Sequence, residues 1–96
     1  MNMNKIWIYG IDEDNDVVKT MWLFNHVSDA QLELIAKRWK AHYGCTRVFA
    51  MMDSKELKDS WFDYMKTRHS KHGTGEFNKV DFIDYLESGD WELAVA

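Results

Sequence analysis

The stretch Val17–Gly44, with the sequence VVKTMWLFNHVSDAQLELIAKRWKAHYG, decides the fold because its hydrophobic period changes part-way along. Its first part is rich in β-branched and aromatic residues, which predicts a strand over 17–26. In its second part, apolar residues recur at steps of three and four, which predicts a helix over 29–43. Ser28 with Gln31 three residues later is typical of a capping box, and the glycine that closes the stretch is typical of a helix end.

The flanking sequence extends this pattern in both directions. Residues 5–9 are β-branched and aromatic, and the short acidic loop 12–16 predicts an antiparallel hairpin with the strand that follows it. Downstream, we expect a third strand over 45–52 and amphipathic helices over 54–72 and 79–88.

The element order β-β-α-β-α-α predicts an α+β fold, with a three-stranded sheet covered by three amphipathic helices. We expect the third strand to lie beside the first, after a right-handed crossover through the first helix. Asp53 and Glu56 are expected to form the capping box of the second helix, and Phe77 and Phe82 the hydrophobic staple of the third. The apolar tail 91–95 is a candidate edge strand.

Length and composition indicate one domain, residues 1–96. The five tryptophans fall in different expected elements, so we expect them in the core. A single cysteine excludes an intrachain disulfide, and we therefore expect a cytoplasmic protein. No apolar run is long enough to span a membrane, and the first residues do not resemble a signal peptide.

The acidic hairpin loop matches only the opening of a calcium-binding loop. Asp12, Asp14 and Asp16 have the right spacing. However, Val17 stands where the sharp turn requires glycine, and Leu23 stands where a bidentate glutamate is required. We therefore expect an ordinary solvated hairpin loop.

Other combinations of reactive residues are incomplete. His69 and His72 are two potential zinc ligands, whereas a structural zinc site needs four. Cys45 follows a helix C-terminus, where the helix dipole disfavours a thiolate nucleophile. Glycine-rich phosphate loops are absent. We accordingly expect no enzyme, no metal and no cofactor.

The charge pattern gives the leading functional hypothesis. The net charge is −4, and acidic residues recur at helical spacing on the second and third expected helices. Apolar residues off the buried stripes of these helices are candidate anchors for a partner. The candidate partner-binding residues are Glu56, Asp59, Phe62, Asp63, Asp81, Asp84, Tyr85 and Glu87.

We therefore expect a protein-binding module that presents an acidic helical surface to a partner with a basic surface. Carboxylates placed where phosphates would lie can mimic nucleic acid. Small size, acidity and the lack of catalytic motifs are typical of phage or mobile-element proteins that inhibit a host protein. A homodimer is compatible with the same apolar residues.

The alternative hypothesis is direct nucleic-acid binding. Four cations and no acid lie between residues 37 and 47, namely Lys37, Arg38, Lys40 and Arg47. Such a cluster can hold a few phosphates, with an affinity that falls steeply with salt.

Overall fold

The computed structural model describes residues 5–24, 27–68, 82–89 and 91–93. Within these ranges the chain forms the elements that the sequence predicts, in the predicted order. They are β1 (Lys5–Ile11), β2 (Val17–Phe24), α1 (Asp29–Tyr43), β3 (Arg47–Met52), α2 (Lys55–Arg68), a short helical segment at 82–87 and β4 (Trp91–Leu93). The fold is therefore α+β, as expected.

The strands form one antiparallel sheet with the order β2-β1-β3-β4. The third strand lies beside the first, as expected. The candidate edge strand is confirmed, because β4 pairs with β3 and brings Leu93 opposite Val48. The sheet therefore has four strands instead of the three that the central pattern predicts.

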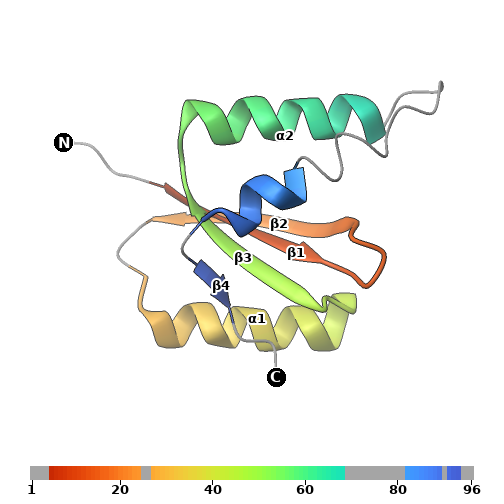
Figure 1. Ribbon diagram of the computed structural model, residues 1–96. Coiled ribbons are helices and arrows are strands. Elements are labelled where there is room, and N and C mark those ends of the chain that lie inside the picture. The colour runs from red at the N-terminus through yellow and green to blue at the C-terminus, as the bar shows by residue number, and fades with distance from the viewer. Residues whose placement is uncertain (1–4, 25–26, 69–81, 90, 94–96) are drawn as a thin grey trace.

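Helices cover both faces of the sheet (Figure 1). On one face, Ile6 and Ile8 of β1 pack with Leu32, Ala36 and Trp39 of α1. This layer forms because alternate residues of a strand point to opposite faces, and the apolar stripe of α1 covers one of them.

The opposite face carries α2 and the segment 82–87, both of which lie above the sheet in Figure 1. Tyr9 of β1 contacts the rings of Trp61 and Phe82, each at a centroid distance of 5.2 Å. Leu57 and Leu86 are buried in the same cluster. Since β1 and β3 contribute to both clusters, the protein has two apolar layers that share one sheet.

The predicted helix boundaries depend on capping. The capping box of Ser28 and Gln31 is present, and Gly44 ends α1 in the left-handed conformation with φ 68°. The start of α2 differs from the prediction, because the Leu57 amide donates to Ser54 Oγ at 3.0 Å. Asp53 instead accepts a hydrogen bond from Trp7 Nε1 at 3.1 Å. Of the predicted staple, Phe77 lies outside the described residues.

One tryptophan, Trp22, departs from the expectation that all five lie in the core. Trp39 is buried, and Trp7 and Trp61 pack against a core cluster while partly exposed. Trp22 is 42% exposed on β2. The side chain of Trp91 lies outside the described part of the structure. Among the described helices, none combines the length and the apolar character that a membrane span requires.

Candidate protein-binding surface

The outer face of α2 carries the first group of predicted site residues. Leu57 and Tyr64 turn into the core, which leaves Glu56, Asp59 and Asp63 exposed. At about 100° per residue, these three acids fall within about 60° of one another around the helix. We call Glu56, Asp59 and Asp63 the acidic stripe.

Phe62 lies beside the acidic stripe. It is 61% exposed, the highest exposed fraction among the large apolar side chains of the described residues. On the helix surface it lies between Lys58 and Lys66, one turn away on either side, and next to Asp59. The anchor thus has ammonium groups one turn away along the helix in both directions, and one carboxylate of the acidic stripe beside it.

The helix as a whole is not acidic. It contains four basic and three acidic residues, and the lysines occupy the stripe next to the acids. Lys58 Nζ lies 3.9 Å from Asp53 Oδ2, so this lysine is directed to the start of its own helix. The local arrangement, and not the net charge of α2, creates the acidic stripe.

The segment 82–87 carries the second group of predicted site residues. Asp84 is exposed, on the same side of the sheet as α2. Tyr85 is half-buried and packs against the core cluster, so less of its ring is exposed than that of Phe62. Asp81 lies outside the described residues.

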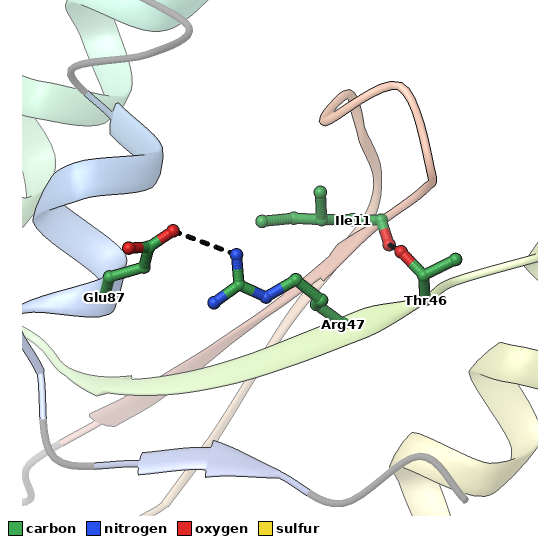
Figure 2. A network of polar contacts seen from close by, with 4 residues as sticks. All are labelled: Ile11, Thr46, Arg47 and Glu87. Carbon is green, nitrogen blue, oxygen red and sulfur yellow. Dashed lines mark hydrogen bonds and ion pairs between the residues drawn. The ribbon is translucent and has the colours of Figure 1, made fainter.

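Glu87 is engaged within the protein. Its Oε1 lies 2.9 Å from Arg47 Nη1, and Figure 2 shows the two side chains reaching toward each other from the segment 82–87 and β3. The Arg47 guanidinium also lies over the Phe49 ring, 4.8 Å from its centroid. Any partner that binds Glu87 must compete with this ion pair.

The predicted basic cluster is split between the two faces of the sheet. Lys37, Arg38 and Lys40 are exposed on α1. Arg47 lies on the other side, because it shares the face of Phe49 and pairs with Glu87. The structure therefore brings together three of the four predicted cations.

The acidic hairpin loop is organised by its own hydrogen bonds. Asp12 Oδ1 accepts from the amides of Asp14 and Asp16, at 2.9 and 3.0 Å. Asn15 adopts a φ of 62°, which this residue type tolerates well. The carboxylate oxygens of the three aspartates can lie within 4.8 Å of one another, yet their geometry follows from closing the turn between β1 and β2. His69 and His72 lie outside the described residues.

Cys45 is buried between α1 and the sheet. Burial, with a smaller contribution from the charge of Asp12, raises the pKa of its thiol. A raised pKa reduces the thiolate fraction, which is the reactive form.

One cluster on β2 was not anticipated from the sequence. Lys5 Nζ lies 4.6 Å from the centre of the Trp22 ring, and Trp22 packs edge-on against Phe24 at 5.4 Å. These residues meet because β1 and β2 pair with Trp7 opposite Trp22 and Lys5 opposite Phe24. The sequence signal is the hairpin itself, but its register depends on a shift within the paired strands at Gly10/Ile11, which the hydrophobic pattern does not reveal.

Comparison of the chain with models of known protein families, with curated proteins and with solved structures finds no match.

Proposed function

We propose that the protein is a non-enzymatic binding module whose docking surface is the outer face of α2. The acidic stripe faces basic groups of a partner protein, and Phe62 enters an apolar pocket beside them. The observation that carries this proposal is the 61% exposed fraction of Phe62 beside the acidic stripe, whose Asp59 is its neighbour on the helix surface. Aromatic anchors surrounded by complementary charge dominate the energy of many interfaces.

The rigidity of α2 supports this role. Its inner face contributes Trp61 and Tyr64 to a ring cluster with Phe82, with centroid distances of 5.2 to 5.3 Å. A helix held in this way presents its outer side chains at fixed spacing, which reduces the entropy lost on binding.

In its sharper form, the proposal takes the partner to be a nucleic-acid-binding protein. The acidic stripe then occupies positions that phosphates would fill, and Asp84 adds a carboxylate on the same side of the sheet. Such a module inhibits its partner by competition, as expected of a small phage or mobile-element inhibitor.

A pull-down from host lysate at low and high salt tests the docking surface. We expect wild-type protein to retain a basic partner at low salt and to lose it at high salt. The variant Glu56→Lys/Asp59→Lys/Asp63→Lys should retain none of it, and Phe62→Ala should bind about tenfold more weakly or worse.

The matched control reverses charge on the opposite side of the sheet. Asp29 and Glu33 are exposed acids of α1, so Asp29→Lys/Glu33→Lys changes charge without touching α2. This control should bind like wild type. Retention of the same partner by the α2 charge-reversal variant would disprove the proposed surface.

A second candidate function is direct binding of nucleic acid through Lys37, Arg38 and Lys40. It is favoured by the exposure of all three cations on the outer side of α1. A gel shift on DNA or RNA that weakens steeply with salt, and is lost in a Lys37→Glu/Lys40→Glu variant, would support it. Absence of any shift at low salt would exclude it.

A further inference from the structure

The outer face of α1 carries a row of exposed residues opposite the stripe that packs on the sheet. They recur at steps of four, three and four, and at about 100° per residue they fall within about 60° of one another. They are Ala30, Leu34, Lys37 and Ala41, which we call the outer seam. Leu34 is 48% exposed, and the stem of Lys37 adds aliphatic surface beside it. This spacing is typical of a helix that packs along a second helix.

The position of α1 makes the outer seam accessible. Of the described elements, α1 alone lies on its side of the sheet (Figure 1). The capping box at Ser28 and the left-handed Gly44 define both ends of the helix, and Leu32, Ala36 and Trp39 hold its inner face in the core. The seam therefore lies on a rigid helix that a second helix can approach along its length.

The charges of α1 are segregated by sign along the helix. Asp29 and Glu33 are exposed in its first half, whereas Lys37, Arg38 and Lys40 are exposed in its second half. Within the part of the chain that the structure describes, neither Glu33 nor Lys40 takes part in an ion pair. A uniformly negative partner such as nucleic acid would meet Glu33 as well as the cations. A helix of the same sequence that runs in the opposite direction meets complementary charge in both halves.

We propose that two copies of the protein associate through antiparallel packing of their α1 helices about a two-fold axis. The acidic first half of each helix then lies beside the basic second half of the other, twice by symmetry. The occupant of the outer seam is thus a second copy of this chain, because α1 is complementary in charge to itself when reversed. This inference is independent of the function proposed for α2, and the contact would compete with nucleic acid for the cations of α1.

The spacing of the outer seam defines the register of this packing. With the two-fold axis between residues 35 and 36, Leu34 lies beside the stem of Lys37 of the second copy, and Ala30 lies beside Ala41. Each of these contacts occurs twice. The small side chains at both ends of the seam let the helices approach to the usual distance of about 8 to 10 Å.

The flanks of the outer seam favour this orientation. Glu33 and Lys40 lie on the same flank of the seam, and in the antiparallel register Glu33 of each copy lies next to Lys40 of the other. Parallel packing would instead place Lys37 directly against Lys37 of the second copy, which is repulsive. Charge therefore selects the antiparallel arrangement.

Analytical ultracentrifugation of the full chain tests the proposal. One helix per copy is a small interface, so the dimer should be weak and reversible, and concentrations up to about 1 mM are needed. We expect wild type to dimerise and Leu34→Lys to remain monomeric, because a charge then interrupts the outer seam. Phe62→Lys is the matched control, since Phe62 is 61% exposed but lies on α2. This control should dimerise like wild type, and circular dichroism confirms that each variant is folded.

A charge exchange between two chains tests the orientation without altering the outer seam. Glu33→Lys and Lys40→Glu should each weaken the dimer about tenfold, since two attractive exposed contacts become repulsive. An equimolar mixture of these two variants should regain wild-type association. In the mixed dimer the new lysine of one chain faces the new glutamate of the other, and the native Glu33 and Lys40 face each other at the second contact.

Three results would overturn the proposal. The first is a wild-type chain that stays monomeric at the highest concentration, including one whose α1 cations bind nucleic acid as a monomer. The second is a dimer that Leu34→Lys leaves intact or that Phe62→Lys abolishes. The third is a mixture of the two charge variants that associates no better than either variant alone.

Discussion

At the scale of single residues, Gly10 has the most restrictive surroundings. A Cβ atom at this position would lie 2.6 Å from Cys45 Sγ and 2.8 Å from Trp39 Cε3, both in buried side chains. Such close packing of α1 on the sheet leaves no space for a methyl group. We expect Gly10→Ala to lower the free energy of unfolding by about 1–3 kcal/mol, as overpacking of a core does. Urea unfolding measures this loss.

Gly44 provides the control for Gly10. A Cβ atom there would meet nothing within 4 Å, but the φ of 68° is unfavourable for residues with a side chain. Gly44→Ala should therefore cost about 1 kcal/mol through backbone strain alone. If Gly10→Ala were as stable as wild type, steric exclusion at Gly10 would not be the reason for glycine.

Burial of Tyr9 makes the stability depend on alkaline pH. Burial, and secondarily the charges of Asp53 and Tyr85, raise the pKa of its phenol well above the ordinary value of 10.0. Above that value the unfolded state releases the proton before the folded state does, so the free energy of unfolding falls as pH rises. Urea unfolding between neutral and alkaline pH should show this decline.

The variant Tyr9→Phe separates this effect from other alkaline transitions. It lacks the titrating phenol, so its stability should decline less steeply above pH 10 than that of wild type. The raised pKa of the Cys45 thiol leaves a smaller decline, which begins near its ordinary value of 9.0. Parallel declines in wild type and Tyr9→Phe would contradict the assignment to Tyr9.

At the scale of elements, local signals in the sequence predicted the strands and helices well. The helix predicted over 29–43 matches α1, because Ser28 and Gly44 determine both of its ends locally. Other boundaries moved in both directions. The strand predicted over 45–52 begins at Arg47, whereas the strand predicted over 5–9 extends to Ile11. The helix predicted over 54–72 is described over Lys55–Arg68, and the rest of the predicted range lies outside the described residues.

Features that depend on contacts distant in sequence could not be predicted. Asp53 was expected to cap α2. Instead, its carboxylate accepts a hydrogen bond from the indole of Trp7, and Ser54 caps the helix by accepting from a backbone amide of the first turn. Arg47 follows the basic helix α1 closely in sequence, yet strand alternation places it on the opposite face of the sheet. The spacing of residues in the sequence therefore predicts neither the hydrogen-bond partner of Asp53 nor the face of the sheet on which Arg47 lies.

The ion pair of Arg47 and Glu87 connects the segment 82–87 to β3. Its side chains are 32% and 45% exposed, so solvent screens the attraction. We expect a double-mutant cycle with Arg47→Met and Glu87→Gln to give a coupling of about 0.2–1 kcal/mol in the free energy of unfolding. A coupling near zero would show that packing of Phe82 and Leu86 holds this segment without the ion pair.

At the scale of the whole molecule, the two apolar layers meet in the same strands. Ile6 and Ile8 of β1 face α1, whereas Tyr9 faces α2. Removal of either helix would expose one face of β1 and β3, so neither layer is stable without the other. The protein should therefore unfold in one cooperative transition.

Two matched truncations test this cooperativity. Leu32 is buried between α1 and the sheet, and Leu57 is buried between α2 and the sheet. Leu32→Ala and Leu57→Ala should each lower the free energy of unfolding by about 2–5 kcal/mol, because each leaves a cavity. In native-state hydrogen exchange, Leu57→Ala should reduce the protection of the most stable amides of α1 as much as those of α2. Loss of protection in α2 alone would mean that the two layers unfold independently, and the sheet would then not couple the α2 surface to the opposite face.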